Sequence, residues 1–272
     1  MPELPEVQVI VTQLRDKVLH KKIVRVEILR TDQWLQNDPA QVVKILINQA
    51  FVDIYRKGKY IIFRLEDGFQ LIVHLRMTGK FCWHPKPTRI DKHTRTVFYF
   101  TDGSCLHYHD LRALGMLILI PPNEEIKSLS QLGADPLSPQ FTREYLWQKL
   151  QGCKLELKDF LLDQKKVAGV GNIYASEILF RSSIHPQTKS FSLSPSQVDR
   201  LYQAIPQVLR EALVHSGTTI SNYRNVDDLE GEFQNFLQVY GKEGQPCPRC
   251  GQVIKRLKQK NRSTFFCESC QK

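Results

Sequence analysis

The sequence has no long hydrophobic run. Its longest apolar segments are short, such as Met116–Ile120, which is followed by two prolines, whereas a membrane-spanning helix needs about 18 to 20 apolar residues. Residues 1–6 contain two prolines and two glutamates and lack the basic and then apolar residues of a secretory signal. These absences exclude a transmembrane protein and predict a cytoplasmic one.

Acidic residues are scarce relative to basic ones. The 272 residues include 38 Lys and Arg against 28 Asp and Glu, which gives a formal net charge of +10. Residues 242–272 contain eight basic and two acidic residues and so carry +6 of this charge. A basic excess suits a polyanionic partner and is uninformative about fold. Nucleic acid is therefore the first candidate partner, ahead of a membrane surface.

Cysteine is too unevenly placed for a disulfide framework. There are seven cysteines, and four of them form two closely spaced pairs at the end of the chain. Four thiolates with this spacing satisfy tetrahedral zinc and leave no open position, and free cysteines are typical of a reducing compartment. The sequence therefore predicts one structural Zn²⁺ bound by Cys247, Cys250, Cys267 and Cys270.

The segment between the two cysteine pairs is basic. It contains Lys255, Arg256, Lys258, Lys260 and Arg262 and is too short to form much core. A zinc-braced hairpin that binds phosphate explains this composition. A merely solvated charged surface is the alternative.

The hydrophobic pattern changes along the chain. Apolar residues recur at three- and four-residue steps over residues 5–20, which predicts an amphipathic helix. Seven runs rich in β-branched and aromatic residues then predict strands at 23–29, 51–55, 60–65, 69–75, 96–101, 104–108 and 116–120. Asp67-Gly68 and Asp102-Gly103 predict tight hairpin turns. The first part of the chain should therefore form an antiparallel sandwich or barrel.

Helical periodicity dominates after a polar linker that begins at Pro121. It covers residues 141–150, 158–164, 173–182 and 196–215, and Ser194-Pro195 and Ser216-Gly217 supply a start and a stop for the last helix. The fold class is therefore α+β. We predict a β-rich domain at 1–122, a helical domain at 135–235 and a metal module at 238–272.

The N-terminus is a candidate nucleophile. Methionine is usually removed before a small residue, which would leave Pro2 with a free secondary amine beside Glu3 and Glu6. An α-amine titrates near pH 8, so a usable fraction is unprotonated at neutral pH and can attack an aldehydic carbon such as a sugar C1′. A neighbouring carboxyl could move the protons. A Pro-Glu pair that merely begins a helix is the alternative.

A glycine-containing turn lies between two predicted helices. Residues 169–174 read Gly-Val-Gly-Asn-Ile-Tyr, and such a turn exposes backbone N–H groups to phosphate at a helix start. Ordinary helix packing explains the same turn equally well.

Taken together, the Pro2–Glu6 segment, the 169–174 turn and the terminal cysteines resemble the bacterial formamidopyrimidine-DNA glycosylase family over essentially the whole chain. Further matching segments include Lys57–Tyr60, His74–Met77, Ser216–Thr219, Gln238–Gly241 and Arg262–Cys267.

The resemblance implies an N-terminal β-sandwich, a helix-two-turn-helix domain and a zinc finger that bind damaged double-stranded DNA as a monomer. It implies excision of oxidised purines and strand cleavage by β,δ-elimination, with no cofactor other than one structural zinc. Pro2 is implied as the nucleophile and Glu3 as the acid/base. Glu6 is implied to orient the N-terminal end, and Lys59 to contact phosphate near the scissile site.

Further DNA contacts follow from the same resemblance. His74, Asn172, Tyr240 and Arg262 are implied to clamp the backbone around an everted nucleotide, because C1′ is shielded in a stacked duplex. Met77, Arg112 and Leu114 are implied to fill the vacated space as a wedge. The family usually has Phe at the position of Leu114 and Arg or Lys at that of Ala113. Lys158 matches by spacing a lysine linked with recognition of the oxidised purine.

Residues 218–233 resemble a lesion-capping loop but are unusually acidic, with Asp227, Asp228, Glu230 and Glu232. His74 and Met77 sit on an apolar strand, where a satisfied core histidine and a packing methionine are the alternatives. Tyr240 could likewise be a core aromatic.

Two rival functions remain at this point. Endonuclease VIII shares the fold and the N-terminal proline but prefers oxidised pyrimidines; it usually has Gly at the position of Leu4, which favours the purine enzyme here. A zinc-finger DNA-binding protein without lyase activity is the second rival, and intact Pro2, Glu3 and Lys59 argue against it.

Overall fold

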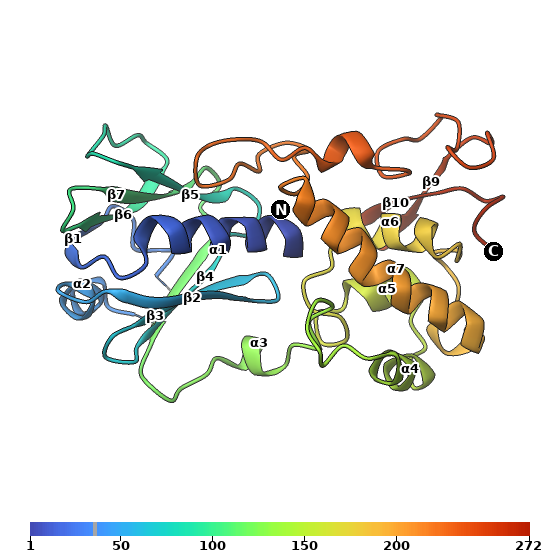
Figure 1. Cartoon of the computed structure of the whole chain (residues 1–272), viewed down its shortest axis with the longest axis horizontal. Helices are drawn as coiled ribbons and strands as arrows, with labels where there is room; N and C mark the ends of the chain where they lie inside the picture. Colours follow the sequence, from blue (N-terminus) through green and yellow to red (C-terminus); the bar gives the residue numbers. More distant parts are fainter. Residues whose placement is uncertain (35–36) are drawn as a thin grey trace. The chain divides into compact units, whose positions relative to one another are not determined.

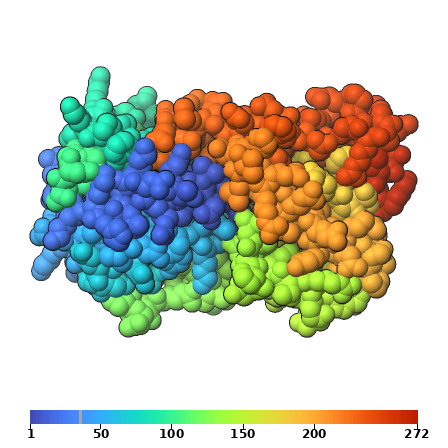
Figure 2. Space-filling model, in the orientation of Figure 1, coloured from blue at the N-terminus to red at the C-terminus, as the bar shows by residue number. Residues whose placement is uncertain are grey.

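The computed structural model describes residues 1–34 and 37–272. The chain begins with helix α1 (Leu4–Val18), which has Glu3 as N-cap, Glu6 in its first turn and a proline in that turn. One face of α1 is buried, including Val7, Ile10 and Leu14. The opposite face reaches the surface, as the dark blue atoms in Figure 2 show.

Two four-stranded antiparallel sheets follow α1 (Figure 1). One has the order β1-β6-β7-β5 and the other β2-β3-β4-β8. The strands are β1 (Ile23–Ile28), β2 (Phe51–Lys57), β3 (Tyr60–Leu65), β4 (Gln70–His74), β5 (Gly79–His84), β6 (Thr94–Phe100), β7 (Cys105–Asp110) and β8 (Met116–Ile120). Helix α2 (Pro39–Leu46) lies between β1 and β2 in sequence.

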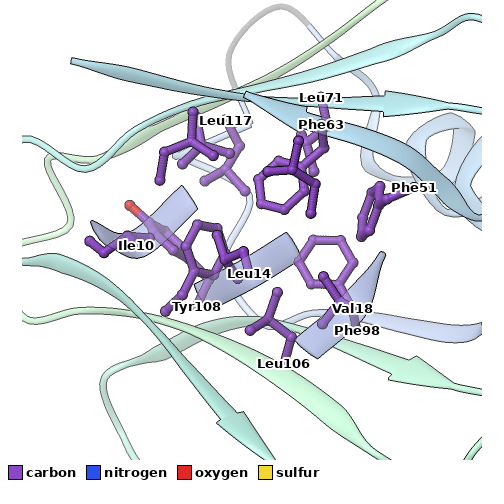
Figure 3. Packing of buried hydrophobic residues seen from close by; sticks show 14 of the residues in the cluster. Ile10, Leu14, Val18, Phe51, Phe63, Leu71, Phe98, Leu106, Tyr108 and Leu117 are labelled. Carbon is purple, nitrogen blue, oxygen red and sulfur yellow. The ribbon is translucent and has the colours of Figure 1, made fainter. Parts of the chain in front are cut away.

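The core of this part lies between the two sheets, and α1 enters it from one side. Figure 3 shows Ile10 and Leu14 of α1 pointing between Phe63 of one sheet and Leu106 and Tyr108 of the other. All five side chains are at most 1% exposed. Burial of side chains of this size contributes about 1.5 to 3 kcal/mol each, so this core fixes α1 relative to both sheets.

The rest of the chain is mainly helical and ends in a hairpin. Its elements are α3 (Lys127–Ser130), α4 (Arg143–Gln151), α5 (Leu157–Leu162), α6 (Asn172–Arg181), η1 (Ser190–Ser192), α7 (Pro195–Val214), η2 (Phe233–Phe236), β9 (Lys255–Gln259) and β10 (Arg262–Phe266). Strands β9 and β10 pair with each other in antiparallel orientation. The buried face of α7 includes Leu201, Ile205 and Leu209.

The described part of the chain divides into two compact units. The first contains residues 1–130 and 215–232, and the second contains residues 131–214 and 233–272. The loop after α7, which the sequence placed within a helical domain at 135–235, therefore packs with the sheets. The limits 1–122, 135–235 and 238–272 remain sequence-based predictions.

The predicted element types agree with the structure at most positions. The helix predicted at 5–20 is α1, the seven predicted strands correspond to β1 to β4 and β6 to β8, and the last helix begins and ends within one residue of its predicted limits. Gly68 and Gly103 have φ of 88° and 82°, as tight turns require. Strand β5 and helices α2 and α3 were not predicted. Among the described residues, no helix is long and apolar enough to cross a membrane.

Candidate active site and nucleic-acid interface

The N-terminal end is buried although it is polar. Pro2 is buried, Glu3 is 3% exposed and Glu6 is 1% exposed. The backbone N–H of Glu3 donates to Oε2 of Glu6 at 2.7 Å. This bond satisfies one of the N–H groups that a helix start leaves unpaired. It also fixes the direction in which the chain leaves α1 toward Pro2.

Glu6 also holds the loop after α7. Its Oε1 accepts the backbone N–H of Thr218 at 2.7 Å, so one carboxylate binds two backbone segments. The preceding Gly217 has φ of 81°, and a Cβ there would lie 2.7 Å from Oε1 of Glu6. A side chain at position 217 would therefore displace the carboxylate. The orienting role that the resemblance implied for Glu6 stays a prediction, and these two hydrogen bonds are consistent with it.

Lys59 lies near the N-terminal amine that Glu3 and Glu6 also affect, and His74 lies near Lys59. Lys59 is in the β2-β3 turn after Gly58, which has φ of 59°. His74 ends β4 and pairs with Tyr60 across the sheet. Lys59 acts electrostatically on both the N-terminal amine and His74. The structure therefore gathers four of the predicted residues around the start of the chain.

Burial changes the proton affinity of these groups. It lowers the pKa of the Met1 amine below its usual value, although the carboxylates of Glu3 and Glu6 act in the opposite direction. Burial, assisted by the charges of Arg76 and Lys59, lowers the pKa of His74 to about 3. The imidazole is therefore neutral at pH 7. Its Nδ1 accepts the N–H of Arg76 at 3.0 Å, so its proton is on Nε2, which can donate.

Met77, Arg112 and Leu114 lie on two neighbouring loops. Met77 is in the β4-β5 loop and is 43% exposed; Leu114 is in the β7-β8 loop and is 48% exposed. Asp110, which is fully buried, accepts a hydrogen bond from the Thr78 hydroxyl and, at 3.2 Å, one from the N–H of Arg112. These bonds link the two loops.

The other carboxylate oxygen of Asp110 completes this network. It accepts hydrogen bonds from the N–H of Gly115 at 2.6 Å and from Nε2 of Gln33 at 2.9 Å. Asp110 was not among the sequence-predicted site residues. Only the fold shows that its carboxylate accepts four donors from three segments.

An Asp110→Asn variant tests this network. The amide keeps the size of the side chain but presents an NH₂ group to existing donors, so we expect the free energy of unfolding to fall by about 2 to 3 kcal/mol. Urea denaturation measures the change. Asp67→Asn in the exposed β3-β4 turn is the matched control, and an equal, small effect of both variants would contradict the predicted role of Asp110.

The four terminal cysteines have the geometry of a zinc site. Their sulfur atoms lie within 4.8 Å of one another, with Cys247 to Cys270 at 3.9 Å and Cys250 to Cys267 at 3.5 Å. Sulfur atoms bound to tetrahedral zinc at about 2.3 Å are separated by about 3.8 Å. The four thiolates therefore fit one structural Zn²⁺, as the sequence predicted.

The zinc module presents a basic hairpin, as the sequence also predicted. Lys255, Arg256, Lys258 and Lys260 are exposed on β9 and its turn, and Arg262 is exposed at the start of β10. Next to Arg262, the carbonyl of Ser263 accepts a hydrogen bond from Nδ2 of Asn172 at 3.1 Å. The hairpin is thereby attached to the N-terminus of α6.

Lys158 attaches the same hairpin to α5. It is fully buried, and its Nζ donates to the carbonyl of Ser263 at 2.8 Å and to the hydroxyl of Thr264 at 2.6 Å. A lysine in this position stabilises the strand that carries Arg262. The recognition role that the resemblance implied for Lys158 stays a prediction.

Tyr240 is positioned by a buried carboxylate. Glu177 of α6 is 3% exposed and accepts the N–H groups of Gln238, Val239 and Tyr240 at 2.8 to 3.0 Å. Burial raises the pKa of Glu177, although these donors act in the opposite direction. The sequence did not single out Glu177. The only indication there is that one acidic residue lies on an otherwise apolar helix face.

Three of the four acidic residues named in this loop are paired with bases. Lys17 contacts Asp227 at 3.0 Å, Lys80 contacts Asp228 at 2.7 Å and Arg224 contacts Glu230 at 2.7 Å. Exposed pairs contribute at most about 1 kcal/mol each. Their main effect is to balance the negative charge of the loop within its own unit.

The comparisons agree along the whole chain. Residues 1–117 match the formamidopyrimidine-DNA glycosylase N-terminal domain, residues 132–224 its H2TH domain and residues 244–272 a zinc finger found in FPG and IleRS. The formamidopyrimidine-DNA glycosylase of Mycoplasma genitalium is 41% identical, over 100% of this chain and 96% of its own length. That of Pelotomaculum thermopropionicum is 37% identical, over 100% and 99%.

Solved structures show the same likeness. A complex between Lactococcus lactis Fpg and abasic-site DNA has a TM-score of 0.93 and 34% identity, over 99% of both chains. A complex of a mutant of that protein with Fapy-dG DNA gives the same values. MutM (FPG) from Thermus thermophilus has a TM-score of 0.89 and 38% identity, over 99% of this chain and 98% of its own.

Proposed function

Because this chain belongs to the formamidopyrimidine-DNA glycosylase family, we propose that Pro2 is the nucleophile with which it acts on damaged DNA. The enzyme is a DNA glycosylase for oxidised purines with the AP lyase activity typical of the family, and it has one structural zinc site. We place this activity in the cytoplasm. The observation that carries the assignment is the buried cluster of Pro2, Glu3, Glu6 and Lys59.

Pro2 acts as the nucleophile once Met1 is removed. Its secondary amine attacks C1′ of the damaged nucleotide, the bond from C1′ to the base breaks, and the base leaves with a proton. Opening of the sugar ring gives an iminium at C1′. Glu3, next to the amine, supplies and removes the protons for these steps.

The iminium makes the C2′ proton acidic, and its loss drives strand cleavage. Elimination of the 3′ phosphate breaks the C3′–O bond, and a second elimination breaks the C5′–O bond. Water then releases the sugar fragment from Pro2. The ammonium of Lys59 stabilises the negative charge of a phosphate leaving beside the site.

Phosphate contacts are proposed for residues of each unit separately. His74 offers a neutral Nε2–H donor at the end of β4, and Asn172, Tyr240 and Arg262 are held by the contacts of Ser263 and Glu177. Hydrogen bonds to phosphate position DNA without reading its sequence. Lys158 contributes through the hairpin that carries Arg262.

The exposed side chains of Met77, Arg112 and Leu114 form the wedge. Apolar side chains that enter the stack offset an unstacking cost of a few kcal/mol per step. Leucine at position 114 offers less stacking surface than the phenylalanine usual in the family. Asp110 keeps both wedge loops in one position.

Borohydride trapping tests the proposed function. Purified protein is incubated with a duplex that carries 8-oxoguanine opposite cytosine, and a duplex with an oxidised pyrimidine is run alongside. We expect a covalent adduct that maps to Pro2, forms preferentially on the purine lesion and is accompanied by δ-elimination products. Preference for the pyrimidine would indicate the endonuclease VIII specificity. DNA binding without any adduct would indicate a non-catalytic protein.

Arg262→Ala tests the clamp. Loss of one phosphate contact should weaken DNA binding and lower the slope of log K against log salt by about one. Lys255→Ala is the matched control, because Lys255 is exposed at the far end of the hairpin and paired with Glu268. Fluorescence anisotropy over a salt series measures both slopes. A wild-type slope in Arg262→Ala would remove Arg262 from the clamp.

A further inference from the structure

Three histidines share one face of the β1-β6-β7-β5 sheet. His84 lies on β5, and His107 and His109 lie on β7. The register pairs Cys82 with His107 and Cys105 with His84, and side chains two residues apart point to the same face. The ring centres of His84 and His107 are 4.7 Å apart, and those of His107 and His109 are 5.6 Å apart. None of these residues takes part in the reaction described above.

The spacing of their nitrogen atoms suits a metal ion. One ring nitrogen from each histidine lies within 4.8 Å of the other two. An ion can therefore be placed within about 2.8 Å of all three atoms, and zinc binds imidazole at about 2.0 to 2.1 Å. Each nitrogen therefore has to move by less than about 1 Å. His84 and His109 are only partly buried, so their rings have room to do so.

His107 supplies an independent observation. It is 1% exposed, and its Nδ1 is buried without a hydrogen-bond partner. Its Nε2 lies 3.5 Å from Sγ of Cys105, whose own thiol points at the carbonyl of Lys86. This arrangement places the proton of the ring on Nε2 and leaves a lone pair on Nδ1. A buried polar atom without a partner is costly, and a metal ion would satisfy it.

His109 is held as metal-bound histidines usually are. Its Nδ1 lies 3.2 Å from Oδ2 of Asp91 and 3.3 Å from the hydroxyl of Thr94. A carboxylate that accepts one ring N–H fixes the orientation of the imidazole and raises its basicity as a ligand. Nε2 of His109 therefore remains available for an ion.

We propose that His84, His107 and His109 form a second metal site, selective for a divalent transition metal such as Zn²⁺. Three imidazoles leave a fourth position for water. The surrounding depression also contains Asp91, Asp227 and Asp228. Asp227 and Asp228 are paired with Lys17 and Lys80, so Asp91, which contacts His109, is the acidic group that supports a cation here.

An ion here would join β5 to β7 beside the loop after α7. Val226 of that loop lines the depression, and its carbonyl accepts the N–H of Trp83 at 3.2 Å. The site would therefore stabilise the part of the sheet on which the loop rests. It is separate from the four-cysteine site, which lies in the other unit.

Zinc stoichiometry tests the proposal. The whole protein, with its cysteine site loaded, is dialysed against micromolar free Zn²⁺, and bound zinc is measured by mass spectrometry. We expect two ions per chain for the wild type and for His93→Ala, a nearby histidine outside the trio. We expect one ion for the double variant His84→Ala/His109→Ala. Zinc should raise the melting temperature of the first two proteins and leave that of the double variant unchanged.

Two results would overturn the proposal. One ion per wild-type chain would show that the trio does not bind zinc under these conditions. Two ions in the double variant would show that the second ion is bound elsewhere. Should the double variant fail to fold, His84→Asn alone must weaken the second ion at least tenfold, and unchanged affinity would reject the site.

Discussion

Replacement of Pro2 by glycine is expected to lower base excision at least about a hundred-fold and to remove most of the borohydride-trapped adduct. Glycine keeps an N-terminal amine after Met1 is removed but loses the ring that fixes the nitrogen beside Glu3. A misplacement of about 1 Å in a nucleophile can cost a hundred-fold in rate. Single-turnover excision on an 8-oxoguanine duplex measures the loss. DNA binding should be largely retained, because the clamp residues are unchanged.

Two controls separate chemistry from folding. Pro39→Gly makes the same substitution at the first turn of α2, in the same unit, and should keep wild-type excision. A chain that retains Met1 carries wild-type Pro2 as an amide, which is not nucleophilic, and should form no adduct at this residue. Wild-type turnover in either Pro2→Gly or the Met1-retaining chain would exclude the N-terminal nucleophile.

Replacement of Cys267 by serine is expected to unfold the zinc module and leave both sheets intact. Cys267 is fully buried and packs with Phe180, Val239 and Ile254. Structural zinc contributes about 10 to 16 kcal/mol of apparent free energy to folding of a finger. Its loss should release β9 and β10, and with them Arg262. DNA affinity should then fall more than in Arg262→Ala, because several basic residues lose their positions together.

Cobalt substitution measures this effect directly, because the thiolate-to-cobalt charge-transfer band reports only the cysteine site. We expect the band to be strongly reduced in Cys267→Ser and unchanged in Cys153→Ser, a buried thiol outside the site. Hydrogen exchange should show lost protection in β9 and β10 alone. Unchanged metal binding in Cys267→Ser would contradict the four-cysteine assignment.

The sequence by itself determined the zinc site and the hairpins, because both depend on residues close together in the chain. The CxxC pairs specify zinc because thiolate number and spacing suffice for a closed tetrahedral site. Period-two runs ending at Asp-Gly specify antiparallel hairpins, since register and turn are both local. Strand β5 was missed because Phe81 and Trp83 are its only large apolar residues, and its pairing with β7 depends on partners distant in sequence.

Only the tertiary structure decided how the polar residues are used. Apart from the family resemblance, nothing in the sequence distinguishes Glu6, Asp110 and Glu177 from ordinary acids. The fold makes Glu6 and Glu177 buried acceptors for backbone N–H groups from remote segments. It also brings the remote side chains of Gln33 and Thr78 to Asp110. Likewise, Lys158 carries no sequence signal that its ammonium is buried against β10. Hydrogen bonding of buried charges depends on contacts between segments up to 212 residues apart, and hydrophobic periodicity carries no information about those contacts.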